Sequence, residues 1–345
     1  MNKKTFKTVA LLVVLLFVIA AFIVYNQVFA GNTKFSSKEI YVNIPSNSKY
    51  EDVKKILALY ITDMDKFDFI AKKRSYNEHV KAGRFLLKNG MSSFGLVTTL
   101  RQNIAVKLAF NNQERIEDLA GRVGSQIEAD SLSLINAFAE PEFLAKNGFT
   151  KDNVLVICLP NTYEMYWNTS AAKFRDKMLK EYQNFWTNER IVLAKENNLT
   201  PIQATILASI VHKESVKKDE RPTIASVYLN RLKIEMPLQA DPTVIYAVKK
   251  SSNDFTRVIK RVIAADLSLN SPYNTYVNLG LPPGPIAMPD ITALDAVLKP
   301  KKTDYLFFCA SVEKFGYHEF ATTFAEHTVI ANKYRDWINN LGVKR

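Results

Sequence analysis

The chain has 345 residues, 47% of them hydrophobic and 23% charged, which suits a folded protein of two domains. Its 11 Gly and 13 Pro follow no period and it has only two Cys, which excludes collagen, solenoids, propellers, zinc fingers and disulfide-rich scaffolds. The net charge of +12 suits a polyanion, an anionic membrane surface or an acidic wall polymer, but no basic patch is interleaved with aromatic residues, so no nucleic-acid partner is expected.

An apolar segment near the amino terminus indicates the compartment. It carries no charge from Val9 to Tyr25, and weakly polar residues extend it to Ala30. Because about 20 apolar residues span a bilayer, residues 9–30 are predicted to be a transmembrane anchor that follows a cytoplasmic tail, residues 1–8. A cleavable signal peptide is the alternative, since the segment ends in a sequence that loosely resembles a cleavage site.

Lysines on the two sides of this segment set the expected topology. Lys3, Lys4 and Lys7 precede it and favour a cytoplasmic amino terminus, although Lys34 and Lys38 follow it. We therefore expect a single-pass protein of the cell (inner) membrane. The lipid bilayer is then one partner, and the remaining chain lies on the outer or periplasmic side.

After a polar linker at residues 31–38, a small α+β module is predicted over residues 39–104. EIYVNIP alternates as a strand does, and YEDVKKILALY has the apolar spacing of a helix. A second helix is expected at 64–73, a strand in HVKAGRFLLK and a third helix in MSSFGLVTTLRQN. Strand, helix, helix, strand and helix in this order make one compact module.

Residues 105–345 are expected to form a larger domain of mixed α/β type. Strands are predicted in VKLAF and in the buried run VLVICLP, helices over 114–147 and 170–186, and a final hairpin (YLFFCAS, YHEFATT) before a closing helix. Cys158 and Cys309 lie in the apolar runs, where they are expected to be small core residues. One disulfide between them is the alternative in an oxidising compartment.

The segment LTPIQATILASIVHKES predicts a helix that carries an acid. Thr200, Pro201 and Gln203 form a capping box with Pro at the first helical position. Helical spacing then places Glu214 on the same face as three apolar residues of the preceding turns. A carboxyl at the edge of an apolar face loses water, which raises its pKa towards the range that a general acid needs. The alternative is a glutamate at the core edge whose carboxyl reaches water or an arginine.

The segments after this helix suggest a cleft for carbohydrate. SPYNTY (271–276) and GLPPGPI (280–286) make a stiff loop whose Asn, Tyr and Thr side chains suit sugar hydroxyls and amides, although a plain surface connection has the same composition. Asp241 precedes Pro242 and is expected to be the N-cap of a helix.

Taken together, the motifs LASIVHKES, ASVYLNRL, LQADPTVIYAV, SPYNTY-x3-GLPPGPI and FATTFAEH resemble the endolytic murein transglycosylases (membrane-bound lytic transglycosylase G, YceG-like) over nearly the whole chain. The resemblance implies one membrane anchor, a LysM-like module at 39–104 and a catalytic domain at 105–345. The catalytic glutamate of the family motif corresponds to Glu214. Many relatives carry a second glutamate where this chain has His212, so no supporting role is carried over to that position.

The resemblance also implies a reaction on the glycan strands of peptidoglycan. Glu214 would protonate the oxygen of the β-1,4 bond between N-acetylmuramic acid and N-acetylglucosamine, and would then take the proton of the C6 hydroxyl that attacks C1. This intramolecular attack needs no metal, cofactor or second carboxylate, and leaves 1,6-anhydro ends on nascent strands, whose length it limits. The resemblance implies substrate contacts at Ser215, Gln239, Asp241, Tyr273, Asn274, Tyr276, Gly280, Leu281, Pro282, Pro283 and Gly284.

Two other functions are kept open. One is a non-catalytic, glycan-binding membrane scaffold that recruits peptidoglycan synthases, and the other is a hydrolase with two carboxylates, for which Glu164 in LPNTYEMYWNTS is the reserve. In that segment Tyr163 and Tyr166 match the family without an assigned role. His318 and His327 are expected to be structural or at the rim of the cleft, because no third metal ligand is evident.

Overall fold

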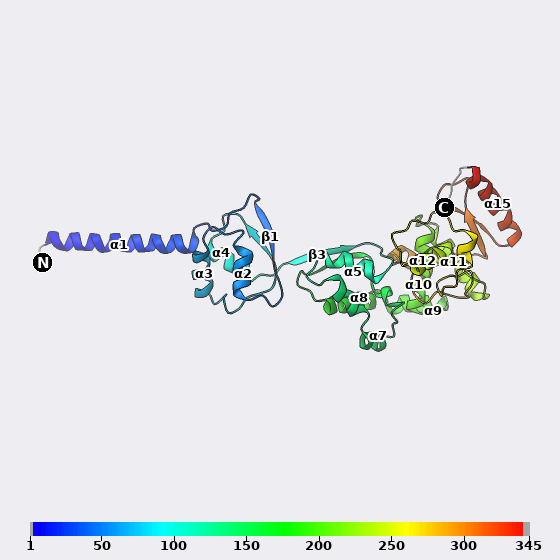
Figure 1. The fold of residues 1–345 in the computed structure, drawn as a ribbon, viewed down its shortest axis with the longest axis horizontal. Helices are drawn as coiled ribbons and strands as arrows, with labels where there is room; N and C mark the ends of the chain where they lie inside the picture. Colours follow the sequence, from blue (N-terminus) through cyan, green and yellow to red (C-terminus); the bar gives the residue numbers. More distant parts are fainter. Residues whose placement is uncertain (1–2, 341–345) are drawn as a thin grey trace. The chain divides into compact units, whose positions relative to one another are not determined.

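The computed structural model describes residues 3–340, and the chain divides into two compact units that are described separately here. The first unit comprises Met1–Leu108, Gln126–Ala129 and Tyr163–Ser170, and the second comprises Ala109–Ser125, Asp130–Thr162 and Ala171–Arg345. Both contain helices and short two-stranded sheets, so the mixed α+β class predicted from the sequence is confirmed (Figure 1).

Helix α1 (Lys3–Phe29) is the long apolar helix at the start of the first unit (Figure 1). Among the described residues it is the one helix long and apolar enough to cross a membrane, and none of its apolar stretch is buried against the protein. At 1.5 Å per residue its 27 residues extend about 40 Å, more than the roughly 30 Å of a bilayer core. Residues 3–340 therefore contain one candidate membrane span, which is consistent with a single-pass protein.

The predicted order of strand, helix, helix, strand and helix is confirmed in the rest of the first unit. Its elements are β1 (Glu39–Ile44), α2 (Tyr50–Leu57), α3 (Met64–Lys73), β2 (Gly83–Lys88) and α4 (Ser93–Thr99). Strands β1 and β2 are antiparallel, with Ile40 opposite Leu87 and Ile44 opposite Gly83. One apolar face of this hairpin and the helices enclose a core in which Val53, Phe67 and Leu96 have no exposed surface.

The segment between α1 and β1 belongs to this fold. Asn32 and Thr33 are buried, and the Asn32 side chain donates to the Asp63 carbonyl (2.7 Å) and to Ser93 Oγ (2.9 Å). The Thr33 hydroxyl donates to the Lys88 carbonyl at 2.7 Å. The end of α1 is therefore joined to the module by hydrogen bonds that span three of its elements.

Strands β3 (Ala105–Phe110) and β4 (Asn161–Tyr166) pair, and the division between the units falls within both. The sequence predicted β3 but not β4. The remaining elements are α5 (Ile116–Gly124), α6 (Ser131–Phe138), α7 (Pro141–Asn147), a 3-10 helix η1 (Val154–Ile157), α8 (Ala171–Phe185), α9 (Asn188–Glu196), α10 (Pro201–Glu214), α11 (Arg221–Lys233), α12 (Asp241–Ser252), α13 (Ala264–Leu267), α14 (Ile291–Leu298), β5 (Phe307–Ala310), β6 (His318–Ala321) and α15 (Phe324–Asn340).

One expectation about the apolar runs is wrong, and one alternative is not realised. Residues Val154–Ile157 of VLVICLP form a buried 3-10 helix and not a strand, because a short apolar run fixes burial but not conformation. Cys158 and Cys309 are both free thiols, so the alternative of a disulfide between them is not realised. The predicted hairpin of β5 and β6 is confirmed as an antiparallel pair.

Helix α10 is the centre of the second unit and packs against α9, α11, α12, α14 and η1. The capping box is present as predicted: the Gln203 N–H donates to Thr200 Oγ1 (3.2 Å), and the Thr200 N–H donates to Gln203 Oε1 (2.9 Å). The helix is buried on every side from Ala204 to Val211, so it is not the one-sided amphipathic helix that the spacing suggested. A helix surrounded by others is held rigidly, and this rigidity extends to its last residue, Glu214.

Candidate active site

Glu214 lies at the carboxyl end of α10, partly buried, where the helix leaves the core. The Tyr228 hydroxyl, on α11, donates a 2.5 Å hydrogen bond to Glu214 Oε1. Tyr228 itself is buried, which raises the pKa of its phenol well above the ordinary value and keeps it a hydrogen-bond donor at neutral pH. One carboxylate oxygen is thereby fixed by a neutral donor.

Burial raises the pKa of Glu214 from 4.5 to about 7, as the sequence predicted for a carboxyl at the edge of an apolar face. The hydrogen bond from Tyr228 and positive charge on His318 act in the opposite direction, while the negative charge of Asp241 raises the value further. At neutral pH the carboxyl is therefore divided between its neutral and charged forms, which is the condition under which one group can both give and accept a proton.

His318 and Glu220 form a pair that is connected to Tyr228 by the ring of Phe308. The His318 ring Nδ1 lies 2.9 Å from Glu220 Oε2, and the His318 backbone N–H donates to Glu220 Oε1 at 2.6 Å. Glu220 is almost fully buried at 6% exposure. Phe308 packs edge-on against both His318 and Tyr228, with ring centroids 5.1 and 5.7 Å away. These contacts order the side of β5 and β6 that faces the acid.

Ser215, the residue after Glu214, is a buried helix end and not an open hydroxyl. Its Oγ donates to Glu220 Oε2 (3.2 Å) and accepts from the Lys217 N–H (3.0 Å). Its carbonyl accepts from Arg221 Nε at 3.0 Å. Ser215 thus fixes the sharp turn from α10 to α11, and its predicted contact with substrate stays a prediction.

Arg221 ties the start of α11 to the start of α14. Its guanidinium, 3% exposed, donates to both oxygens of Asp290 at 2.7 and 2.9 Å and to Thr292 Oγ1 at 2.6 Å. His212 Nδ1 lies 3.4 Å from Asp290 Oδ2. Burial alone would raise the pKa of Asp290, but His212 and Arg221 outweigh it and hold that pKa well below its usual range.

Asp241 is not the N-cap predicted from the sequence. The N-cap of α12 is Ala240, and Asp241 is the first residue of the helix with Pro242 after it. Its Oδ1 accepts a 2.6 Å hydrogen bond from the Tyr276 hydroxyl instead. Loss of water raises the pKa of Asp241 and the bond from Tyr276 opposes this shift. A carboxylate that the sequence assigned to capping is therefore available beside Glu214.

The chain just before Asp241 is held in an uncommon conformation. Gln239 has a φ of 50°, in the left-handed region that residues with a Cβ seldom adopt. Arg231, on α11, binds this segment by donating to the carbonyls of Pro237 and Leu238 and to Gln239 Oε1 at 2.9, 3.0 and 3.3 Å. Such local strain, paid for by neighbouring contacts, is typical of functional sites.

The loop residues predicted to bind substrate divide into two groups. Tyr276 reaches the site through Asp241, whereas Asn274 is completely buried and its amide donates to two carbonyls of the loop before it. Tyr273 is 2% exposed and its hydroxyl donates to Asp152 at 3.2 Å. Gly284 is buried so closely that a Cβ there would lie 1.9 Å from the Asp152 carbonyl oxygen.

The other residues of this loop are described by their exposure. Pro283 is exposed, Gly280 and Leu281 are partly exposed and Pro282 is buried. The loop is held against α10 because the Ile286 N–H donates to Ser209 Oγ at 3.1 Å. Contact between this loop and a substrate stays a prediction.

The remaining sequence candidates have no contact with Glu214 among the interactions of the described residues. Glu164 and Tyr166 are exposed on β4, where Tyr163 is buried. His327 stacks on Phe307, with ring centroids 5.3 Å apart. Neither Tyr228 nor Glu220 was predicted from the sequence, although Tyr228 lies within the quoted motif ASVYLNRL, six residues after Pro222 at the start of α11.

Sequence comparison assigns the chain to a family and finds similar proteins. Residues 42–333 match the YceG-like family, and the chain belongs to that family. The endolytic murein transglycosylase of Bacillus subtilis (strain 168) is 29% identical over 327 residues, covering 87% of this chain and 86% of that protein. The protein of the same name from Streptococcus pneumoniae serotype 2 is 28% identical over 312 residues, and this chain spans 55% of its length.

A solved structure has a similar fold. The crystal structure of a YceG-like protein from Listeria monocytogenes superposes with a TM-score of 0.57 at 28% identity, covering 86% of this chain and 99% of that one. The residues that match the family model include Glu214.

Proposed function

We propose that this protein is an endolytic murein transglycosylase that cleaves the β-1,4 bond between N-acetylmuramic acid and N-acetylglucosamine in peptidoglycan strands. The observation that carries the proposal is Glu214: a carboxyl on a rigid helix end, bonded to Tyr228, with its pKa raised to about 7. Family membership and the names of the curated relatives support the same reaction.

In the proposed mechanism one residue serves twice. Neutral Glu214 protonates the departing glycosidic oxygen as the bond to C1 breaks. The resulting carboxylate then accepts the proton of the muramic acid C6 hydroxyl, whose oxygen forms the new bond to C1 and closes the 1,6-anhydro ring. The proton returns to Glu214, so no water is consumed. Tyr228 holds the carboxyl in place through both steps, because its own proton is retained at neutral pH.

The setting of the reaction is part of the proposal. With α1 as a single membrane span and the lysine-rich tail in the cytoplasm, the folded units lie on the outer side of the cell (inner) membrane, close to newly made strands. The module around β1 and β2 is proposed to be LysM-like and to bind glycan. Cleavage there would limit strand length, and peptidoglycan synthases are the expected partners.

A hydrolase remains the second candidate, and one observation favours it. Asp241 lies beside Glu214 and is not occupied as a helix cap, so the site contains a second carboxyl group. A hydrolase would use it to activate water or to attack C1. The two reactions differ in product: hydrolysis leaves reducing ends, whereas the transglycosylase leaves 1,6-anhydro ends.

The test uses purified murein sacculi and the full chain in detergent, with products identified by mass spectrometry. We expect anhydro-ended fragments from the wild type, none from Glu214→Gln, and retained anhydro products from Asp241→Asn. Reducing ends that disappear in Asp241→Asn, while the variant stays folded, would establish the hydrolase. Intact sacculi with wild type and Glu214→Gln alike would leave the non-catalytic scaffold as the function.

A further inference from the structure

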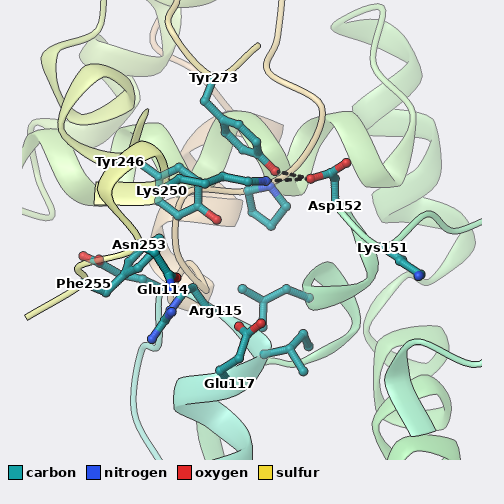
Figure 2. A pocket seen from close by; sticks show the side chains of 13 residues that line it. Glu114, Arg115, Glu117, Lys151, Asp152, Tyr246, Lys250, Asn253, Phe255 and Tyr273 are labelled. Atoms are coloured by element: carbon teal, nitrogen blue, oxygen red, sulfur yellow. Dashed lines mark hydrogen bonds and ion pairs between the residues drawn. The ribbon is translucent and has the colours of Figure 1, made fainter. Parts of the chain in front are cut away.

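A pocket that does not include Glu214 lies in the same unit as that residue. Its volume is about 380 Å³, within the size range of small-ligand sites. Figure 2 shows its walls: Tyr246 and Lys250 from α12, Arg115 and Glu117 from the start of α5, and Asp152 from the turn before η1. None of the predicted substrate residues except Tyr273 lines it.

The cations of this pocket are held over aromatic rings. Lys250 Nζ lies 4.3 Å from the centroid of the Tyr273 ring and also 2.8 Å from Asp152 Oδ1. The Arg115 guanidinium lies 4.0 Å from the centroid of the Phe255 ring. Cation–π contacts of this kind orient a charged group without neutralising it. Arg115 also binds Asp118, at 2.6 and 3.1 Å, so each cation is paired with one carboxylate and keeps N–H donors beyond those that this pair uses.

Carboxylates stand opposite these cations. Asp152 accepts from both Lys250 and Tyr273, as the dashed lines in Figure 2 show, and Glu117 is exposed at the lower wall. The pocket thus offers both signs of charge.

The pocket is connected to the proposed catalytic site by α12 and by one ion pair. Asp241 begins α12 beside Glu214, and Lys250 lies on the same helix at a rise of about 14 Å from it, at 1.5 Å per residue. Glu114 lines the pocket and binds Lys213, the neighbour of Glu214, at 2.6 Å. An extended peptide of about four residues covers the same distance, at 3.3–3.6 Å per residue.

We propose that this pocket binds the charged stem peptide of the strand whose sugar is held at Glu214. The peptide carries carboxylates, which suit Lys250 and Arg115, and an ammonium group, which suits Glu117 and Asp152. Neutral sugars have no use for this combination of charges. The inference rests on the proposed function for its choice of peptide, while the pocket itself rests on the described side chains.

The experiment measures binding to the full chain in detergent by calorimetry. The probes are a muramyl tetrapeptide and the same sugar without the peptide. Lys250→Gln and Glu117→Gln are each expected to weaken binding of the muramyl tetrapeptide about tenfold, as loss of a hydrogen bond to a charged group does. Both side chains lie at the surface, so the fold is expected to survive, and thermal unfolding checks this. Lys195→Gln, an exposed lysine on α9, is the matched control and should bind as the wild type does.

Two outcomes overturn the proposal. In one, Lys250→Gln and Glu117→Gln bind the muramyl tetrapeptide as tightly as the control. In the other, the peptide-free sugar binds with equal affinity and the same sensitivity to these substitutions. Failure of the proposed function looks different: the wild type then binds the peptide, the variants lose it, and sacculi yield no anhydro ends. That result would keep the pocket and remove the lytic reaction.

Discussion

Replacing Glu214 by Gln tests whether the acid is held in a site that disfavours its charge. The substitution keeps the size of the side chain and an oxygen that can accept the hydrogen bond from Tyr228. It removes the only group at this position that titrates. Because burial raises the pKa of Glu214, the folded protein binds a proton more tightly than the unfolded chain, and ionisation above that pKa costs stability.

The size of the effect follows from the two pKa values. With a pKa of about 7 in the folded state and 4.5 in the unfolded chain, linkage gives a cost of roughly 3 kcal/mol at pH 8 and less than about 0.5 kcal/mol at pH 4. The stability is fully present below pH 4.5 and is lost as the pH rises through about 7. Glu214→Gln avoids this loss. For a unit of this size the gain at pH 8 is roughly 6–12 °C in melting temperature.

Thermal unfolding followed by circular dichroism from pH 4 to pH 9 measures the difference. We expect the two proteins to melt together at pH 4 and to separate as the pH rises from about 4.5 to about 7, with Glu214→Gln the more stable. Glu196→Gln, at an exposed glutamate on α9, controls for the same change in net charge. Parallel melting curves for wild type and Glu214→Gln across the whole range would refute the reasoning, because an ordinary, solvated carboxyl gives that result.

Three further predictions follow from contacts around the site. Tyr228→Phe removes a hydrogen bond that lowers the pKa of Glu214, so the alkaline limb of the pH–rate profile is expected to move to higher pH. Asp241→Asn removes a charge that raises this pKa, so the same limb is expected to move to lower pH. Alkaline limbs at the wild-type pH in both variants would contradict the assignment. Arg221→Met removes the buried guanidinium that binds both oxygens of Asp290, which keeps His212 as its ionic partner, and is expected to cost about 3 kcal/mol by denaturant unfolding, against little for an exposed arginine. Gly284→Ala places a Cβ 1.9 Å from a backbone oxygen and should cost about 1–3 kcal/mol, with a wild-type midpoint as the contrary result.

The sequence predicted those parts of the molecule whose signal is local. The capping box at Thr200, the strands β1 and β2 and the final hairpin each depend on residues a few positions apart, and each is confirmed. The raised pKa of Glu214 was also within reach, because helical spacing alone placed it beside apolar residues. The 3-10 conformation within VLVICLP could not be predicted, since a run that is apolar throughout shows neither helical nor strand periodicity.

The rest of the site depends on contacts between distant segments. His318 and Glu220 lie 98 positions apart, and Tyr276 and Asp241 lie 35 apart, so no local pattern joins them. Asp-Pro at a helix start is common as a cap, and that local preference gave the wrong role for Asp241 because the Tyr276 hydroxyl competes for its carboxylate. The sequence alone therefore predicted helices and strands better than it predicted the hydrogen-bond partners of individual side chains.

The hydrogen bonds of Asn32 and Thr33 have a consequence for where the chain can work. They fix the segment that follows α1 to the first folded module, so that no flexible linker separates this module from the helix when α1 is in a bilayer. The distance of the module from the lipid surface is then fixed by the end of α1. Glycine-rich residues inserted after Phe29 would increase that distance, and the protein would then reach glycan strands farther from the membrane.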